Sequence, residues 1–381
     1  MTIANTTLRN LVAGEGSTVY RTIVSYPASA TYVPGTDITA VAVTGSSESL
    51  TIGTWLSSRV VIDDTERVQS IIELGSNISN KMMMDHNNRI EQAVLAEVTN
   101  AAWTLDDGNV GGTSGNNAIV NTNTVPQFFV AADTKLDAID APKAGRTAVI
   151  GGHFLGQLKL QQAGRPGSVI GDGVNTRGIV TQLFGWDILY SNNLPYTCVL
   201  TMDTNPTDGD TFTIAGVTFT YKTTQGSTAG VINICSDAAH TVTSTVTTLN
   251  NLATSVTEAT DAGYNAISSE NIFLLRDKRR ITAVETNSTT ITITGYGDIV
   301  VSETFTAATN VFSAQRQDAL FCVAGCIDMV VQIPPKVEVV RDNKQFADNV
   351  KSLLGFGKKT YADGAREMVR VKIDASTSDW S

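Results

Sequence analysis

The sequence has few of the residues on which metal sites and disulfide-stabilised folds depend. Of its 381 residues, four are cysteines and three are histidines. The cysteines, Cys198, Cys235, Cys322 and Cys326, include no C-x-x-C pair. We therefore expect neither a disulfide framework nor a zinc site, and this usage fits a reducing compartment. Cys322 and Cys326 fall in an apolar run, where we expect small buried side chains.

Long apolar runs are absent too. No stretch approaches the roughly 18 apolar residues of a membrane-spanning helix. The residues after Met1, TIANTTLRNLVAGEG, lack both the charged and the apolar part of a signal peptide. We expect a soluble protein that is not secreted through a signal peptide and has no membrane partner.

Positive charge is scarce. Lys and Arg total 27 against 37 Asp and Glu, which gives a net charge of -10 and a pI near 4.8. This balance argues against a groove that reads nucleic-acid sequence, because such a surface would repel phosphates. The length and an apolar share of 42% favour a folded globular protein of two or three domains.

Readable catalytic motifs are also missing. The histidines, His86, His153 and His240, lie far apart with no acidic or cysteine partner at ligand spacing, so we interpret them as solvated or capping residues. The stretch GSVIG at 167–171 puts Ser168 one place too early for a nucleophile elbow. We expect no enzyme, and no catalytic, cofactor-binding or metal-binding residue.

Two other patterns favour structural interpretations. The stretch GFGKKT at 355–360 resembles a phosphate loop only superficially, because Ser352 stands where a glycine is required, and we expect a turn there. The basic run Arg276, Lys278, Arg279 and Arg280 lies in an acidic segment. We interpret it as a salt-bridged or subunit-facing strand end.

What the sequence does contain is a long helical pattern from Asp63 to Trp103. Asp63, Asp64 and Thr65 offer capping side chains, and Glu66 places negative charge at the positive end of the helix. Apolar residues then recur at helical spacing: Val68, Ile71, Ile72, Ile78, Met82, Ile90, Val94 and Val98. A helix of about 40 residues would span roughly 60 Å.

Three interpretations of this helix compete. A coiled coil is disfavoured because Asp85, His86, Asn87 and Asn88 interrupt the apolar seam. We prefer a single helix laid across a sheet or against neighbouring subunits, bent near Gly75. An ordinary long helix buried in a large enzyme stays open at this point.

The residues before the helix form two segments. Residues 1–30 have scattered apolar residues without a period, which indicates an arm that takes its order from something else. Residues 31–62 contain short β runs separated at Pro34-Gly35 and at 45–47. Because the alternation in residues 38–43 gives neither face a clearly apolar character, we expect an extended hairpin lying on a partner.

After the helix the order is that of a compact α+β domain. Thr124 opens a second helix with Val125, Phe128, Ala132, Leu136 and Ile139 on one stripe, and Pro142 and Gly145 end it. RTAVIG reads as a buried strand, HFLGQLKLQQ as a short helix, and IVTQLFGWDILYSNNLP as two strands turning at Phe184-Gly185.

From 197 to 318 the composition changes. Threonine accounts for 28 of the 122 residues, and 6 basic against 12 acidic residues give a net charge of -6. DTFTIAGVTFTYK predicts a half-buried hairpin that turns at Ala215-Gly216, and the spacing from Val242 to Val256 predicts one helix. We interpret this segment as a separate acidic β-rich module. From Ala319 onwards, apolar strands return, separated at Pro334-Pro335, Asn343-Lys344 and Asp363-Gly364.

The order of these parts resembles the major capsid proteins of tailed bacteriophages, the Hong Kong 97-type fold. The phrases that carry the resemblance are VVIDDTERVQ, GRTAVIGGHFLGQL, GWDILYSNNLP and LLGFGKKTYADGAREMVRVKID, within residues 15–196 and 319–375. The resemblance implies an α+β fold with these parts: an N-terminal arm at 1–30, an extended loop at 31–62, a spine helix and first peripheral part at 63–123, axial parts at 124–196 and 319–334, an inserted domain at 197–318, and a second peripheral part at 335–381.

The resemblance also implies a function. We expect a structural protein that self-assembles through pentamers and hexamers into an icosahedral head shell around double-stranded DNA, located in the virion and assembled in the host cytoplasm. Scaffolding, portal and decoration proteins are expected partners. Some relatives crosslink through a lysine on the extended loop, but the first lysine here is Lys81, so contacts of this loop must be non-covalent.

The junction of loop and helix supplies the candidate contact residues. We expect intersubunit ion pairs from Arg59, Asp63, Asp64, Glu66 and Arg67, and an apolar anchor from Trp55 beside Leu56. The alternative function, from another class, is a phage or bacterial surface adhesin whose threonine-rich module binds a ligand. A bacterial encapsulin-like compartment would share the fold but would not need so large an acidic insertion.

Overall fold

The computed structural model describes residues 3–7, 16–24, 29, 31–38, 45–69, 74–163, 182–259, 262–297 and 299–375. Contacts within the chain divide it into two units. Unit 1 comprises Met1–Glu97 and Ala324–Ala365, and unit 2 comprises Val98–Val323 and Arg366–Ser381. None of the described helices is long and apolar enough to cross a membrane.

Unit 1 is built on a four-stranded sheet with the order β1-β19-β20-β4. Its strands are β1 (Ala4–Asn5), β4 (Thr54–Asp63), β19 (Ile327–Arg341) and β20 (Ala347–Lys359). The three long strands are antiparallel neighbours, and β4 pairs with β20 from Thr54 opposite Phe356 to Asp63 opposite Ala347. The helix α8 (Ala362–Arg366) follows β20. Residues nearly 300 positions apart in the chain therefore share one sheet.

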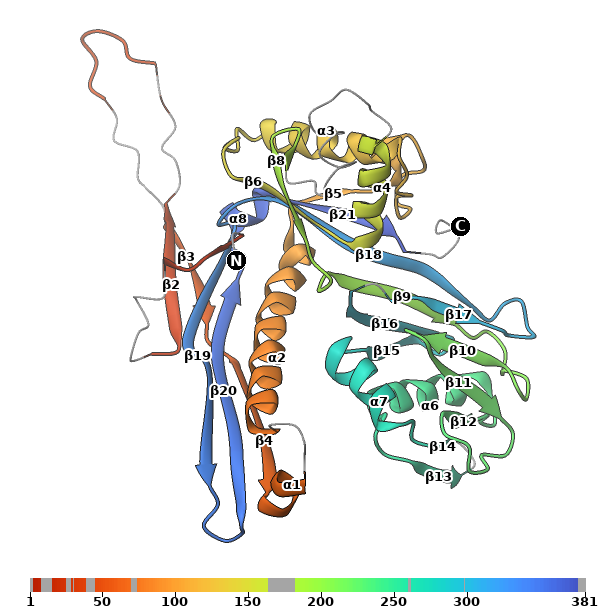
Figure 1. The fold of residues 1–381 in the computed structure, drawn as a ribbon. Coiled ribbons are helices and arrows are strands. Elements are labelled where there is room, and N and C mark those ends of the chain that lie inside the picture. Colours follow the sequence, from red (N-terminus) through yellow and green to blue (C-terminus); the bar gives the residue numbers. More distant parts are fainter. Residues whose placement is uncertain are drawn as a thin grey trace. The chain divides into compact units, whose positions relative to one another are not determined.

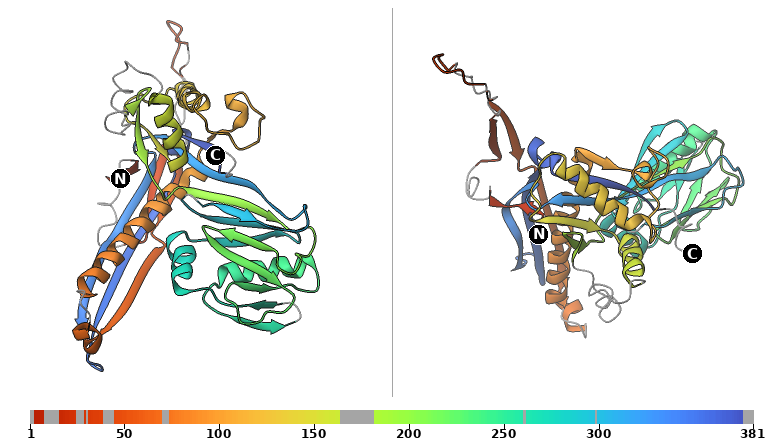
Figure 2. Two further views of the ribbon diagram at one scale, coloured as in Figure 1. Left: turned by 45° about the vertical axis from the view of Figure 1, so that its right-hand side comes forward. Right: turned by 90° about the horizontal axis from the view of Figure 1, so that it is seen from above.

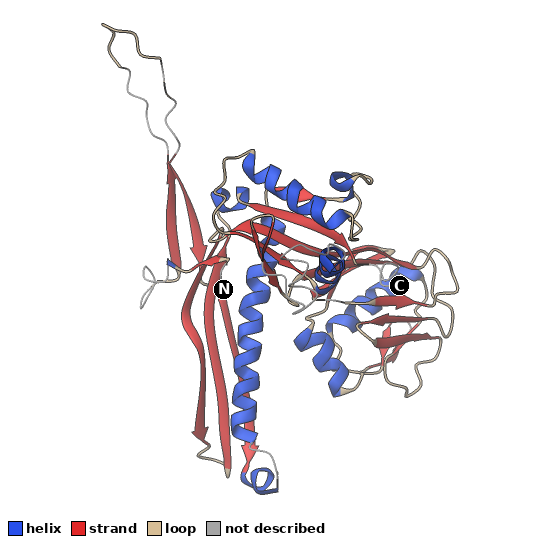
Figure 3. Cartoon of the chain, turned by 45° about the horizontal axis from the view of Figure 1, so that its top comes forward, coloured by secondary structure: helices blue, strands red, loops and turns tan. Residues whose placement is uncertain are grey.

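One helix lies along this sheet (Figures 1 and 3). It is α2 (Leu74–Ala96), which contacts β4, β19 and β20, preceded by α1 (Asp64–Gln69) and followed by the short helix η2 (Glu97–Asn100). Met82, Ile90 and Val94 are buried as the apolar pattern predicted. A single helix over 63–103 is wrong, because α1 and α2 are separate and Trp103 belongs to strand β5 (Trp103–Leu105). Ile71 and Ile72 lie outside the described residues.

A two-stranded ribbon joins the predicted arm to the predicted extended loop. Strand β2 (Thr18–Val24), from the expected arm, pairs along its length with β3 (Gly45–Thr51) as a two-stranded ribbon (Figure 3). Strand β4, expected in the loop, is instead an edge strand of the sheet. The described parts of the predicted arm include β1 and β2, which pair within this chain. Most of the predicted β run DITAVAVTG at 37–45 lies outside the described residues.

Unit 2 contains a sheet of nine strands, in which β15-β16-β9-β18-β6-β8-β7 form the main path and β21 and β5 extend from β18. The remaining bounds in this sheet are β6 (Arg146–Ile150), β7 (Gln182–Leu183), β8 (Trp186–Tyr190), β9 (Pro195–Thr201), β15 (Thr282–Asn287), β16 (Thr290–Tyr296), β18 (Val311–Val323) and β21 (Met368–Asp374). The helices η3 (Asp107–Val110), α3 (Thr124–Asp137) and α4 (Gly152–Ala163) also belong to unit 2.

The inserted segment adds a six-stranded sheet, ordered β13-β14-β12-β11-β10-β17. Its strands are β10 (Thr211–Ile214), β11 (Val217–Lys222), β12 (Val231–Asn233), β13 (Val256–Ala259), β14 (Ala262–Tyr264) and β17 (Val301–Glu303). Its helices are α6 (Ala238–Asn250), α7 (Ser269–Ile272) and η4 (Phe273–Lys278). Helix α6 contacts strands of both sheets. Figure 2 shows the insertion, coloured green to cyan, from two further sides.

The insertion is not a separate module, contrary to the sequence interpretation. Strand β18 pairs with β9 of the insertion through residues 311–317 and with β6 through residues 320–323, so one sheet runs through both parts. The composition changes near residue 197, but the backbone hydrogen bonds continue. The individual domain boundaries proposed from the sequence stay predictions.

Two apolar cores stabilise unit 2. The first gathers Phe128, Phe129, Phe154 and Phe321 with Trp186, whose rings meet mostly edge to face at 5.1 to 6.3 Å between centroids. The second lies in the insertion and gathers 23 buried residues, among them the stacked pair Phe212 and Phe219. Both turns predicted from the sequence are confirmed, with positive φ at Phe184-Gly185 and at Ala215-Gly216.

Candidate functional site

The predicted apolar anchor, Trp55, lies on β4 rather than on an extended loop. It is 52% exposed, and it sits opposite Gly355 of β20. A methyl group at Gly355 would overlap the indole ring, so this glycine makes room for Trp55. Its neighbour Leu56 is half-buried and pairs with Leu354. One face of the Trp55 ring is thus packed within the chain and the rest is available to a partner.

The predicted ionic contacts have partners within unit 1. Arg59 Nε donates to Asn349 Oδ1 at 2.8 Å, and Arg59 Nη2 lies 3.6 Å from Asp342. The hydrogen bond from the Asn349 amide lowers the pKa of Asp342, with a smaller contribution from Arg59. These bonds hold the guanidinium over β20.

The start of α1 is capped as the sequence indicated. Asp63 Oδ1 accepts hydrogen bonds from the amide and the hydroxyl of Thr65, at 2.8 and 2.7 Å, and these bonds lower the pKa of Asp63. Asp64 pairs with Arg341 at 2.6 Å. Glu66 and Arg67 belong to α1, but their side chains lie outside the description. An intersubunit role for any of these residues stays a prediction.

Strand pairing assembles a surface that the sequence analysis missed. The register aligns Arg59, Lys351 and Glu338 in one row across β4, β20 and β19, and Ser57, Leu353 and Lys336 in the next. An open groove runs along these rows and is also lined by Ser58, Ile333 and Ser352. It lies on the face opposite α2, since Ile62, Val350 and Met82 pack together on the other face. We call this surface the β4–β19 groove.

The β4–β19 groove is basic on an acidic protein. Its lining holds three cations, Arg59, Lys336 and Lys351, and one carboxylate, Glu338, which pairs with Lys336. That pairing lowers the pKa of Glu338. Arg59 also lies 3.6 Å from Asp342. Leu353, 40% exposed, provides an apolar floor. In the sequence, charged and apolar residues alternate in KVEVV at 336–340, and KSLL follows at 351–354. Only the strand register shows that the lysines of the two stretches lie near Arg59.

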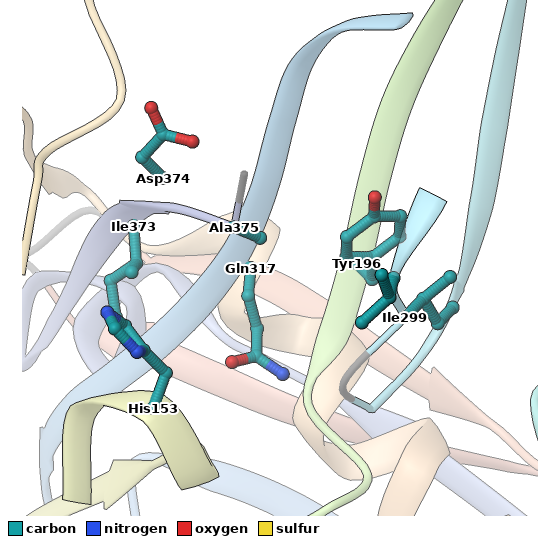
Figure 4. A pocket seen from close by; sticks show the side chains of 8 residues that line it. His153, Tyr196, Ile299, Gln317, Ile373, Asp374 and Ala375 are labelled. Atoms are coloured by element: carbon teal, nitrogen blue, oxygen red, sulfur yellow. The ribbon is translucent and has the colours of Figure 1, made fainter. Parts of the chain in front are cut away.

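A second hollow, in unit 2, is too small for a substrate. It is lined by His153 of α4, Tyr196 of β9, Gln317 of β18 and the end of β21, as Figure 4 shows. Its volume is about 20 Å³, which fits a water molecule. Burial raises the pKa of the Tyr196 phenol, so this hydroxyl stays protonated at neutral pH.

The histidines differ from the sequence interpretation. His86 is only 2% exposed and completes the buried stripe of α2 between Met82 and Ile90, and neither ring nitrogen has a hydrogen-bond partner. Desolvation lowers its pKa. His153 is buried as well, whereas His240 is exposed at the start of α6, with its ring 2.9 Å from the capping residue Asp237. The interpretation of His86 and His153 as solvated residues is therefore wrong.

Two further sequence interpretations change. The glycine-rich stretch from Gly355 is the end of strand β20 and not a turn; a methyl group at Gly357 would lie 2.6 Å from the carbonyl oxygen of Thr51. The basic run begins in η4 and not at a strand end, although Arg276 is salt-bridged, to Asp277 at 3.0 Å. All four cysteines are buried and none forms a disulfide, and burial was expected for Cys322 and Cys326. Among the described residues, no cluster of His, Cys, Asp and Glu could hold a metal ion.

Comparison with known proteins identifies the fold. No protein-family model and no curated protein matches the sequence. A solved structure from Mycobacterium phage Che8 is similar over 96% of this chain and 88% of its own, with 15% identity and a TM-score of 0.53. The capsid structure of Cyanophage P-SCSP1u is similar over 94% of this chain and 84% of its own, with 13% identity and a TM-score of 0.52. The chain therefore has the α+β, Hong Kong 97-type fold of tailed-bacteriophage major capsid proteins, as the sequence resemblance implied.

Proposed function

We propose that this chain is a non-enzymatic major capsid protein that self-assembles, through pentamers and hexamers, into an icosahedral shell around double-stranded DNA. The observation that carries the proposal is the similarity of fold over nearly the whole chain to phage structures, one of them a capsid. The open sheet of unit 1 supports it, because a shell subunit must leave surfaces for its neighbours. The proposed location is the virion, with assembly in the host cytoplasm.

We propose non-covalent contacts between the loop of one copy and the β4–β19 groove of the next. The tip of the loop exposes Tyr32, Val33 and Ile38, the last of them 83% exposed, together with Asp37. The groove offers Leu353 and three cations. An apolar and acidic segment thus complements an apolar and basic surface, which favours association in one register. Trp55, on the rim, is the proposed anchor.

The charge of the chain suits a container for DNA. With a net charge of -10, the wall offers few cations to displace the counterions of phosphates, so packaged DNA would lie near the wall without binding tightly. Scaffolding and portal proteins are proposed partners in assembly. The insertion is the proposed site for decoration proteins or for bracing between neighbours.

Negative-stain electron microscopy of the purified chain tests the proposal. Closed icosahedral shells are expected. Discrete trimers or monomers in every condition that favours assembly would contradict it and would favour the adhesin alternative.

Paired variants localise the contact. Trp55→Ala and Leu353→Asp should prevent shell assembly while the far-UV circular dichroism of the subunit stays that of the wild type. Val284→Asp is the matched control, because Val284 is an exposed apolar residue on β15 of unit 2. We expect this control to form shells. Normal shells from both groove variants would refute the assignment.

A further inference from the structure

The ribbon β2–β3 is attached to unit 1 by two different kinds of contact. The first is an apolar seat, in which Val19, Leu50 and Ile52 pack with Val330 and Tyr361. Gly357 of β20 has no side chain, and this lets the backbone of Thr51 and Ile52 approach β20 closely. The amide of Ile52 donates to Ser17 O at 2.7 Å, which closes the base of the ribbon.

The second contact is a set of ionic bonds from one cross-strand pair. Arg21 of β2 and Glu48 of β3 lie opposite each other in the ribbon. Arg21 Nη1 donates to Asp363 Oδ1 at 3.3 Å, and the guanidinium lies 5.2 Å from the centroid of the Tyr361 ring. Glu48 Oε2 accepts from the amide of Ala362 at 3.1 Å. Both members of the pair therefore hold the segment where α8 begins.

A buried carboxylate extends these bonds to the sheet. Asp328 of β19 is 3% exposed, and its Oδ2 lies 3.6 Å from Arg21 Nη1. Asn5 of β1 donates to Asp328 Oδ1 at 2.7 Å, which fixes the carboxylate. Burial raises the pKa of Asp328, and the charge of Arg21 acts in the opposite direction. An arginine between one buried and one exposed carboxylate is thus held from two sides.

We propose that Arg21 and Glu48 form a latch that sets the direction in which the ribbon leaves unit 1. The apolar contacts of the seat are not directional, and the hydrogen bond from Gln332 Nε2 to Gly16 O, at 3.2 Å, lies at the base of the ribbon. These contacts alone would let the ribbon pivot about its base. Charge-assisted bonds from two residues to α8 and to β19 fix one orientation. The inference concerns the single subunit and deepens the proposed function, because the ribbon carries the loop that we propose to dock on a neighbour.

Hydrogen exchange on the full chain before assembly tests the latch. A two-stranded ribbon is marginally stable without support, so release of the latch should expose its amides. In Arg21→Ala we expect peptides covering 18–24 and 45–51 to exchange roughly tenfold faster, as loss of about 1.4 kcal/mol of local stability predicts. Peptides of α2 and of residues 347–356 should not change. Unchanged exchange in the ribbon would overturn the proposal, and so would an equal increase throughout unit 1.

Three other variants separate the parts of the latch. Asp328→Asn should have a smaller effect than Arg21→Ala, because Arg21 keeps Asp363. Glu48→Gln should behave like the wild type, because the amide oxygen still accepts from Ala362, whereas Glu48→Ala should loosen the ribbon. Arg341→Ala is the matched control: it removes a comparably exposed arginine with two carboxylate partners, Asp64 and Asp348. Faster ribbon exchange in this control would count against a specific latch.

The latch and the proposed function fail in different ways. Absence of shells from the wild-type chain would contradict the capsid proposal and leave ribbon exchange unaffected. Unchanged exchange in Arg21→Ala would contradict the latch even if wild-type shells form normally.

Discussion

The two units differ in how completely their sheets are covered. Among the described residues, two clusters of unit 2 gather 22 and 23 buried residues. Unit 1 has clusters of five and three at the ribbon and α2 and also buries residues such as Ile90, Val94 and Phe356, but one face of its sheet stays open. On its long strands unit 1 exposes Trp55, Val61, Val340 and Leu353, which the strand register places on one face of the sheet. Because large exposed apolar patches usually mark interaction surfaces, we propose that another copy of the chain covers this face of unit 1.

Removing a ring from the unit 2 core should have the largest effect on subunit stability. Phe321 lies 5.1 Å from Phe129 and 5.2 Å from Trp186 between ring centroids. Phe321→Ala should lower the free energy of unfolding by about 3–5 kcal/mol, because it leaves a cavity. Leu353→Ala, on the open face of unit 1, should cost less than about 1 kcal/mol. Urea denaturation of both variants measures this, and equal losses would remove the contrast between the units.

The next largest effect should come from the seat of the ribbon. Gly357→Ala would put a methyl group 2.6 Å from Thr51 O. We expect a loss of about 1–3 kcal/mol, as for other overpacked sites. Gly53→Ala is the control, because Gly53 has no heavy atom within 4 Å of a built methyl group. Thermal unfolding compares them, and equal melting temperatures would show that the ribbon does not rest on β20.

A buried hydroxyl in the insertion and an exposed one on the ribbon should differ by a smaller amount of stability. The hydroxyl of Tyr221 pairs with Thr245 at 2.7 Å in the core of the insertion. Tyr221→Phe should cost about 1 kcal/mol in urea denaturation, since it removes one buried hydrogen bond. Tyr20→Phe, on the exposed ribbon, should cost nothing measurable. If Tyr221→Phe left the free energy of unfolding unchanged, the stability of the threonine-rich core would not depend on this hydrogen bond.

The smallest predicted effect on the free energy of unfolding appears only below neutral pH. His86 is buried in unit 1 and its pKa is lowered below 6.5 by desolvation, with opposing effects from Asp85 and Arg89. Below about pH 6.5 the unfolded chain binds a proton that the folded chain does not, so stability falls as the pH drops towards the folded pKa. The unfolding free energy of wild type minus that of His86→Leu should therefore decrease between pH 7.5 and 5. A pH-independent difference would contradict the burial of a neutral ring.

Local patterns predicted the elements of unit 2 well. The stripe after Thr124 and the glycines at the two hairpin turns act within a few residues, so the helix α3 and both turns could be predicted from the sequence. The sequence predicts too long a helix, because the helical spacing of apolar residues continues past both ends of α2. His86 was misjudged since a polar residue in the middle of a stripe looks like an interruption.

The candidate site could be predicted only in part. Trp55 and Arg59 were identified, but their place on an edge strand depends on pairing with β20, about 300 residues later. Lys336 and Lys351 were missed for the same reason. Pairing between distant strands leaves no local trace in the sequence, so the groove and the ribbon base could be found only from the structure.

The central claim is that the open face of unit 1 is covered by another copy of the chain. Electron cryomicroscopy of particles assembled from the purified protein measures this directly. The account predicts a closed shell in which density from a neighbouring subunit fills the β4–β19 groove and contacts Trp55. A shell whose groove faces solvent, or a chain that stays a stable monomer under all assembly conditions, would contradict it.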